Sequence, residues 1–256
     1  DARVSTYRSG SYNLIFTCLH EAGHAMYSSS SSQPVIDAGL WGGIEGGFHE
    51  ASARFFENMI GHSLAYWQFY YPQLQQELPL FRGIPLDQFY ALTHRVQPTL
   101  RRISSDEVTY SLHAILRFEL ERDYFAGLLT AGDMAEAWND KYESYLGIRP
   151  QNDTEGVLQD MHWAGDYIGY FQSYALGNIY DGQILAAMQR DLPDLPARLA
   201  RGDAGCAAAW MEEHIWQYGC CYTAGEMVRR LTGGGLDAQP FLDYLDQTYS
   251  AVYGLA

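Results

Sequence analysis

Apolar residues recur along most of this chain at the spacing of an α-helix. They occupy positions i, i+3, i+4 and i+7 in ten segments, whereas strand-like alternation is scarce. This pattern predicts an all-α protein built from many helices. The expected helices cover residues 11–28, 46–70, 86–97, 105–129, 133–146, 170–190, 196–202, 205–217, 221–232 and 238–253.

Short connectors with helix-breaking residues, such as Arg149-Pro150, separate these segments. The one region with room for strands lies near residues 35–45, where VIDAGLWGGIE is rich in glycine. We expect at most one short hairpin there. No connector has the composition of a linker between domains. The sequence therefore predicts a single domain over residues 1–256.

The amino-acid composition limits the kinds of partner that this protein is expected to bind. The 256-residue chain is 47% hydrophobic and carries a formal net charge of −15. This charge argues against nucleic acid and anionic membrane surfaces as partners, because both attract basic patches. No apolar run reaches the length of about 18 residues that a transmembrane helix needs. The four cysteines form no CxxC pair, which indicates reduced thiols and a cytoplasmic location.

The most informative motif is HEAGH, residues 20–24, inside the first predicted helix. His20 and His24 lie one helical turn apart on the same face, so both imidazoles can bind one tetrahedral zinc ion. Glu21 is then placed to act as the general base that activates water. The motif therefore predicts a metal-dependent peptide hydrolase.

A catalytic zinc site needs a third protein ligand and leaves a fourth position for water. The candidates lie at or near the start of the next predicted helix. Spacing alone does not choose among them, since two of the glutamates lie seven residues apart on one helix face and a histidine is also possible. The candidates are Glu45, His49, Glu50 and Glu57.

Several sequence blocks resemble a known family, the M32 metallocarboxypeptidases of the carboxypeptidase Taq type. HEAGH is similar to the family's HExxH block, and HEASAR at 49–54 is similar to the block that carries the third metal ligand. GVLQDMHW at 156–163 matches the family's GxxQDxHW block. DARVST at 1–6, RRISSDE at 101–107 and IGYFQSYALGN at 168–178 are similar to further blocks in the same order.

The resemblance implies an α-helical HExxH metallopeptidase fold with a long substrate groove. It implies Glu50 as the third ligand, a zinc ion that cobalt can often replace, and a homodimer. It also implies removal of single residues from peptide C-termini with broad specificity. Ordinary members are much longer, and the matching blocks begin at residue 1. We therefore expect that the N-terminal half of the family fold is missing from this chain.

The stretch HWAGDYIGYFQSY offers groups that can stabilise the oxyanion formed during amide hydrolysis. Histidine and tyrosine suit this task because they donate hydrogen bonds without adding a fixed negative charge. The family resemblance favours His162 and Tyr170 as transition-state donors and Tyr174 as a substrate contact. Core packing is the alternative for any one tyrosine in a chain that contains 20.

An exopeptidase that acts at C-termini must bind a free carboxylate, which a guanidinium group can do with two parallel hydrogen bonds. Arg102 occupies the place of the arginine in the family's IRxxADE block, so the resemblance points to it as the carboxylate-binding residue. The alternatives are a solvated side chain and a salt bridge to Asp106. Arg54, on the helix of Glu50, is expected to orient a neighbouring carboxylate.

The HEAGH motif and the family resemblance together imply a zinc-dependent carboxypeptidase that acts on peptides with a free C-terminus. Two alternatives remain. One is an endopeptidase or oligopeptidase on the same HExxH helix, which an open groove would favour. The other is a shortened metal-binding protein without catalytic activity.

Overall fold

The computed structural model describes residues 2–6 and 12–255, and within these ranges it contains helices and no β-strand. The all-α prediction is therefore confirmed. The α-helices are α1 (Leu14–Ser29), α2 (Gln33–Asp37), α3 (Gly46–Arg54), α4 (Leu64–Glu77), α5 (Leu86–Thr93), α6 (Glu107–Phe125), α7 (Met134–Leu146), α8 (Phe171–Asp191), α9 (Leu195–Leu199), α10 (Gly205–His214), α11 (Ala224–Thr232) and α12 (Gln239–Tyr253).

Five further helical segments join these elements in the described part of the chain. One is a π-helix, η1 (Phe55–Ile60). The others are 3₁₀ turns, namely η2 (Pro79–Phe81), η3 (Arg102–Ser104), η4 (Trp163–Gly165) and η5 (Trp216–Tyr218). The predicted helix over 11–28 begins at Ser11, which lies outside the described residues. No helix in the described part of the chain combines the length and the apolar character needed to cross a membrane.

The predicted hairpin near residues 35–45 is wrong, because this region begins with helix α2 and contains no strand. Ser32 has an extended backbone and Pro34 lies in the first turn of α2, where its missing N–H leaves no hydrogen bond unmade. Gly39 and Gly42 follow with φ values of 75° and 94°. These left-handed conformations favour turns over a paired strand.

The long helix predicted over residues 46–70 is interrupted. α3 continues directly into the π-helix η1, and a new helix, α4, begins after Ser63. The Ser63 hydroxyl accepts a hydrogen bond from the Tyr66 backbone N–H at 3.2 Å, so Ser63 caps α4. The apolar spacing continues across this break, which is why periodicity alone did not reveal it.

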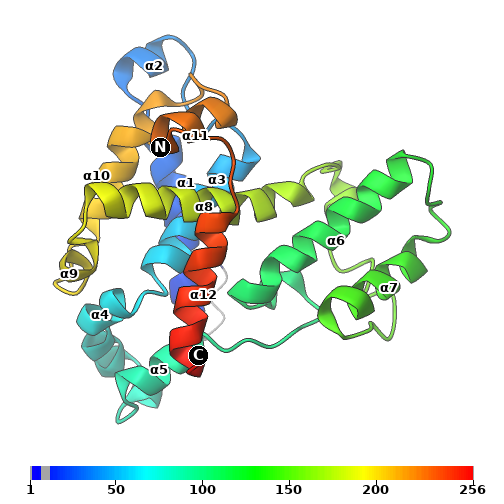
Figure 1. Ribbon diagram of the computed structural model, residues 1–256, viewed down its shortest axis with the longest axis horizontal. Coiled ribbons are helices and arrows are strands. Elements are labelled where there is room, and N and C mark those ends of the chain that lie inside the picture. Colours follow the sequence, from blue (N-terminus) through cyan, green and yellow to red (C-terminus); the bar gives the residue numbers. More distant parts are fainter. Residues whose placement is uncertain (1, 7–11, 256) are drawn as a thin grey trace. The chain divides into compact units, whose positions relative to one another are not determined.

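The chain forms two compact units, one combining residues 1–94 with 177–256 and the other formed by residues 95–176. In the first unit, α1 packs against α3 and η1 (Figure 1). Gly23 of α1 permits this packing, since a Cβ atom there would lie 2.3 Å from the Ser52 carbonyl oxygen of α3. An aromatic core lies nearby, composed of Phe16, Trp67, Tyr71, Leu74, Phe81 and Phe89.

In the second unit, α6 and α7 pack side by side (Figure 1). Their facing surfaces form a core of large apolar side chains, namely Leu116, Leu120, Trp138, Tyr142 and Leu146. α8 begins in this unit and continues into the first. The prediction of a single catalytic domain stays a prediction.

Candidate active site

Three side chains suited to binding a metal meet between α1 and α3. One ligand atom from each of His20, His24 and Glu50 lies within 4.8 Å of the others. α1 places the two imidazoles one turn apart, and α3 contributes the buried carboxylate. Two imidazole nitrogens and one carboxylate oxygen are a donor set that fits a catalytic divalent metal with an open position for water.

Both histidines direct their Nδ1 atoms away from this cluster. His20 Nδ1 lies 2.9 Å from Glu57 Oε2. His24 Nδ1 lies 2.9 Å from His49 Nδ1. The Nε2 atom of each ring is thus left for a metal, and His20 Nε2 lies 4.0 Å from Glu50 Oε2. The arrangement is consistent with the donor set, because neutral imidazole binds metals through the nitrogen that carries no proton.

The other three candidates for the third ligand are engaged elsewhere. Glu57 and His49 contact the two histidines from outside the cluster. Glu45 directly precedes α3, and its Oε1 accepts a hydrogen bond from the Tyr180 hydroxyl at 3.0 Å. Glu50 is therefore the carboxylate that the geometry groups with the two histidines.

The electrostatics of the two histidines differ. Burial lowers the pKa of His20, but the hydrogen bond and attraction to Glu57 outweigh it, so the pKa is raised overall. For His24, burial followed by repulsion from His20 and His49 lowers the pKa to about 4. Burial acts to raise the pKa of Glu57, but the hydrogen bond with His20 and the attraction of Arg54 lower it overall. Glu57 thus favours a proton on the His20 ring, whereas the surroundings of His24 disfavour a second proton on that ring.

The second unit brings together three of the predicted site residues. His162 directly precedes η4, Tyr170 directly precedes α8, and Tyr174 lies in the first turn of α8. His162 Nε2 lies 2.9 Å from the Tyr174 hydroxyl, and the rings of His162 and Tyr170 are 6.1 Å apart. Burial and then the charge of Arg102 lower the pKa of His162. The three residues therefore form one cluster of hydrogen-bonding groups.

Arg102 lies beside this cluster and is only 6% exposed. Its guanidinium donates to Asp160 Oδ1 at 3.3 Å and to the Tyr110 hydroxyl at 3.0 Å. It also lies over the Tyr174 ring, 4.1 Å from the ring centroid. Arg102 thus forms its ion pair with Asp160. Asp106 instead caps α6, where its side chain accepts a hydrogen bond from the Thr109 N–H.

Arg117 is the neighbour that sequence reasoning missed. It is fully buried on α6, and its Nε donates to Asp160 Oδ2 at 2.7 Å. Burial acts to raise the pKa of Asp160, but the charges of Arg117 and Arg102 lower it overall. The available signal was an arginine among the apolar residues of the helix predicted over 105–129, since arginine is almost never fully buried unless it is paired.

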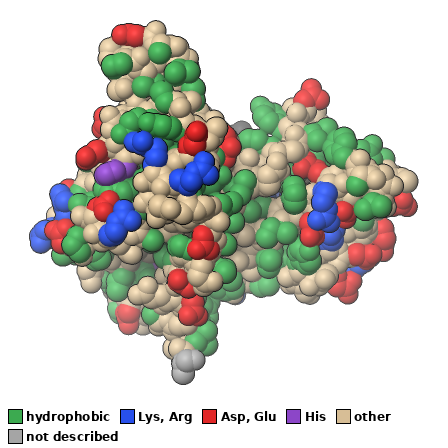
Figure 2. Space-filling model, turned by 45° about the horizontal axis from the view of Figure 1, so that its top comes forward, with side chains coloured by type: hydrophobic (Ala, Val, Ile, Leu, Met, Phe, Trp, Pro, Cys, Tyr) green, Lys and Arg blue, Asp and Glu red, His purple; other side chains and the backbone are tan. Residues whose placement is uncertain are grey.

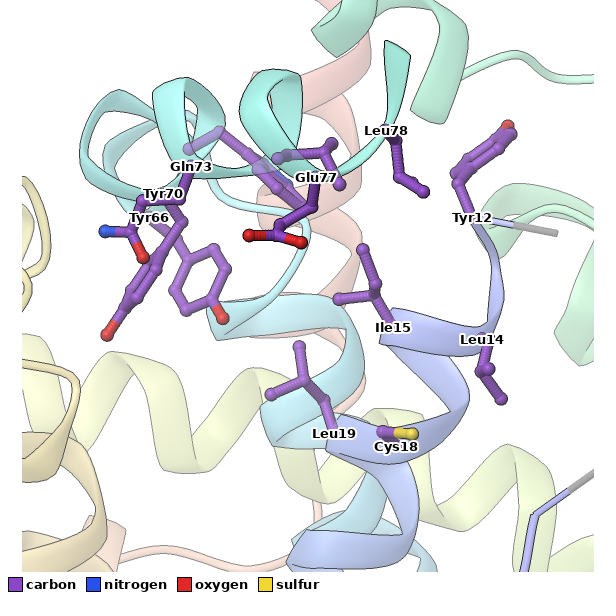
Figure 3. A pocket seen from close by; sticks show the side chains of 12 residues that line it. Tyr12, Leu14, Ile15, Cys18, Leu19, Tyr66, Tyr70, Gln73, Glu77 and Leu78 are labelled. Carbon is purple, nitrogen blue, oxygen red and sulfur yellow. The ribbon is translucent and has the colours of Figure 1, made fainter. Parts of the chain in front are cut away.

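An apolar groove in the first unit lies between α1 and α4 and has a volume of about 630 Å³. Figure 3 shows Ile15 and Leu19 of α1 on one side and Tyr66, Tyr70 and Glu77 of α4 on the other. None of the three candidate metal ligands, His20, His24 and Glu50, lines this groove. The groove is therefore separate from the candidate metal site.

Basic side chains are few, and on the face drawn in Figure 2 they lie apart from one another with acidic and apolar groups between them. This distribution agrees with the counts of 16 Lys and Arg against 31 Asp and Glu. It offers no continuous basic stripe on that face for a phosphate backbone.

Comparison with known proteins gives one consistent result. A sequence model described as carboxypeptidase Taq (M32) metallopeptidase matches residues 1–249. The chain is 38% identical to carboxypeptidase 1 of Bacillus subtilis and 37% identical to thermostable carboxypeptidase 1 of Thermus thermophilus, in each case over 99% of this chain. It covers 51% and 50% of those proteins, so it spans about half the length of the curated relatives it matches.

Solved structures agree with the sequence comparisons. The M32 carboxypeptidase of Deinococcus radiodurans is 39% identical and superimposes with a TM-score of 0.91, over 94% of this chain and 49% of that one. The Pyrococcus furiosus carboxypeptidase is 35% identical with a TM-score of 0.88, over 92% of this chain and 47% of that one. The helical fold is thus shared with these structures along nearly the whole of this chain.

Proposed function

Because this chain belongs to the carboxypeptidase Taq (M32) family of metallopeptidases, we propose that it is a metal-dependent carboxypeptidase that releases single residues from peptide C-termini. The family implies a divalent metal and peptide substrates. The observation that carries the proposal is the meeting of His20, His24 and Glu50 between two packed helices. One ligand atom from each of these three side chains lies within 4.8 Å of the others, and two imidazoles with one carboxylate form the donor set of a catalytic metal site.

We assign the metal to these three residues and expect zinc, with cobalt as a substitute. Two imidazoles and one carboxylate form a mixed nitrogen and oxygen set that suits zinc. When bound, such a metal polarises the scissile carbonyl and makes water a stronger nucleophile. Glu21 lies on the same helix between the two histidines. Its carboxylate takes the proton that the attacking water loses and delivers it to the leaving amine nitrogen.

His162 and Tyr170 donate hydrogen bonds to the oxyanion that develops on the scissile carbonyl in this proposal. Tyr174 contacts the substrate, and its hydroxyl also holds the His162 ring from a distance of 2.9 Å. These residues lie in the second compact unit and the metal ligands in the first. We therefore also propose that the two units act as a single catalytic domain over residues 1–256.

Arg102 is the proposed carboxylate-binding residue. Support comes from its fixed guanidinium, which Asp160 and Tyr110 hold from one side and the Tyr174 ring supports from another. A guanidinium held in this way loses little conformational entropy when it binds a second carboxylate. The same contacts give Arg102 a second task, which is to position Tyr174.

The proposed partners are peptides with a free C-terminus, with neither nucleic acid nor membranes among them. The net charge of −15 supports this choice. A homodimer is proposed from the family resemblance. A cytoplasmic location is proposed from the cysteines, which form no disulfide at any of the four described positions.

A matched pair of peptides tests the exopeptidase activity. The two peptides have the same sequence, but one ends in a free carboxylate and the other in an amide. We expect the protein loaded with zinc to shorten only the free acid, and removal of the metal by a chelator to stop the reaction. Equal cleavage of both peptides at internal bonds would establish the endopeptidase alternative. Loss of activity that zinc does not restore would contradict the assigned role of the metal.

A further inference from the structure

We propose that Glu57 is the positioning residue of the metal centre, holding the His20 ring by its Nδ1–H so that Nε2 faces the metal. A neutral partner, His49, does the same for His24. The inference rests on the proposed metal-dependent function, because it assigns a role around the same three ligands. It adds a difference between the two histidines, one supported by a carboxylate and the other by an uncharged ring.

The two nitrogens of His20 face two different carboxylates. Nδ1 lies 2.9 Å from Glu57 Oε2, which is hydrogen-bonding distance, whereas Nε2 lies 4.0 Å from Glu50 Oε2. A carboxylate accepts hydrogen bonds, so the proton of a neutral His20 ring belongs on Nδ1. The lone pair of Nε2 then points to the side where Glu50 lies. Glu57 thereby fixes both the tautomer and the rotation of the ring.

Glu57 is itself held in place. It lies in the π-helix η1, which follows α3 without a break. Arg54 Nη1 lies 3.9 Å from Glu57 Oε2, and Arg54 Nε donates to Asn178 Oδ1 at 2.5 Å. Arg54 is only 6% exposed. A chain of contacts therefore runs from α8 through buried Arg54 and half-buried Glu57 to His20.

The π-helical geometry gives this contact a structural explanation. Glu50 and Glu57 lie seven residues apart, which in an uninterrupted α-helix places them on nearly the same face. In this chain their carboxylates lie near different nitrogens of the His20 ring. The wider turns of a π-helix change the direction of the residues they contain, and such segments occur often at functional sites. The change from α3 to η1 therefore lets Glu50 serve as a metal ligand while Glu57 supports His20.

His24 has an uncharged counterpart to Glu57. Its Nδ1 lies 2.9 Å from His49 Nδ1, so one of the two nitrogens donates and the other accepts. If His24 uses Nε2 for the metal, its Nδ1 carries the donated proton and His49 accepts it. A carboxylate partner makes an imidazole a stronger donor to a metal than a neutral partner does. Loss of Glu57 should therefore weaken the site more than loss of His49.

The test compares Glu57→Gln with His49→Gln and with a control, Glu77→Gln. Glu77 is an exposed carboxylate on α4, so its substitution changes the net charge equally without touching His20. Zinc affinity is measured at fixed pH by competition with a chromophoric chelator. We expect Glu57→Gln to bind zinc about 10- to 100-fold more weakly, His49→Gln to lose less affinity, and the control to match the wild type. Equal affinity of Glu57→Gln and wild type would overturn the inference.

A second measurement does not depend on the folding of any variant. Nitrogen NMR of the zinc-loaded wild type reports which nitrogen of each histidine is protonated and which is bound to metal. We expect His20 to carry its proton on Nδ1 and to bind zinc through Nε2. Zinc bound through Nδ1 of His20 would contradict the role of Glu57. A wild type that binds no zinc at all would instead remove the proposed function, so the two failures are distinguishable.

Discussion

Gly23 of α1 lies directly against the backbone of Ser52 of α3, and this approach sets the spacing between the helices that carry the metal-type ligands. A Cβ atom at Gly23 would lie 2.3 Å from the Ser52 carbonyl oxygen and 2.6 Å from the Ala53 Cα atom. Neither atom belongs to a flexible side chain that could move aside. The absence of a side chain at one position of HEAGH therefore brings His24 and Glu50 close together.

Replacing Gly23 with alanine should force α1 and α3 apart. We expect Gly23→Ala to lower the free energy of unfolding by about 1–3 kcal/mol, the usual range for overpacking, and to weaken zinc binding. Gly225→Ala is the control, since Gly225 also lies in a helix and a Cβ atom there would approach only the flexible end of Arg229, at 3.9 Å. Denaturant unfolding and zinc competition measure both effects. Unchanged stability of Gly23→Ala would show that the spacing is adjustable.

The Tyr170 hydroxyl is expected to act in the transition state. Tyr170→Phe should lower kcat by about 10²- to 10³-fold, the usual loss on removing one oxyanion donor, with little change in KM. Tyr167→Phe is the matched control, because Tyr167 lies three residues earlier and is 61% exposed. Steady-state kinetics on one peptide give both constants. A kcat for Tyr170→Phe equal to that of the control would assign Tyr170 to packing.

Arg102→Lys keeps the positive charge but removes the planar fork that binds a carboxylate with two hydrogen bonds. We expect KM for free-acid peptides to rise about 10- to 100-fold, in line with the 1.5–3 kcal/mol of a hydrogen bond to a charged group. Arg101→Lys changes the exposed neighbouring arginine and should have no effect. If kcat falls while KM stays the same, Arg102 acts through Tyr174 and not on the substrate carboxylate.

His113 makes the stability of the second unit depend on pH. It is fully buried on α6, and burial followed by the charges of Arg117 and Arg102 lowers its pKa from 6.5 to about 3, although Asp160 opposes this effect. Between these values the unfolded chain binds more protons than the folded one, so stability falls as the pH decreases. We expect this group to account for a loss of about 2 kcal/mol between pH 6.5 and 5.

The contribution of His113 can be isolated by comparing variants. Urea unfolding at several pH values should give a shallower dependence on pH for His113→Gln than for the wild type. His214→Gln, on α10 in the first unit, should keep the wild-type dependence. Parallel curves for His113→Gln and the wild type would mean that His113 binds a proton equally well in the folded and the unfolded protein, which would contradict the prediction.

Local sequence patterns predicted much of this fold. The spacing of apolar residues located the long helices, and the repeat of histidine after four residues predicted a shared face for His20 and His24. Asp106 precedes α6 and its side chain accepts the Thr109 N–H, as expected for a residue at a helix start. These features depend on residues within one or two helical turns of each other, which is the range that periodicity can describe.

Features that depend on tertiary contacts could not be predicted in the same way. The π-helix η1, which carries Glu57, is not signalled by any periodic pattern. The burial of Arg117 depends on Asp160, which lies 43 residues away in the sequence. The predicted hairpin failed because residues 33–37 form a helix with Pro34 in its first turn, and Gly39 and Gly42 after it adopt left-handed turn conformations. The choice of Glu50 among four candidates needed either the family resemblance or the packing of α1 on α3.

Mass spectrometry of a free-acid peptide, incubated with the zinc-loaded wild type or with Glu21→Gln, tests the central claim most directly. We predict a ladder of products that each lack one more C-terminal residue for the wild type. The ladder should be absent for Glu21→Gln, although that variant still binds zinc through His20, His24 and Glu50. A ladder of equal intensity from Glu21→Gln, or no cleavage by a wild type that holds one zinc ion per chain, would contradict the account.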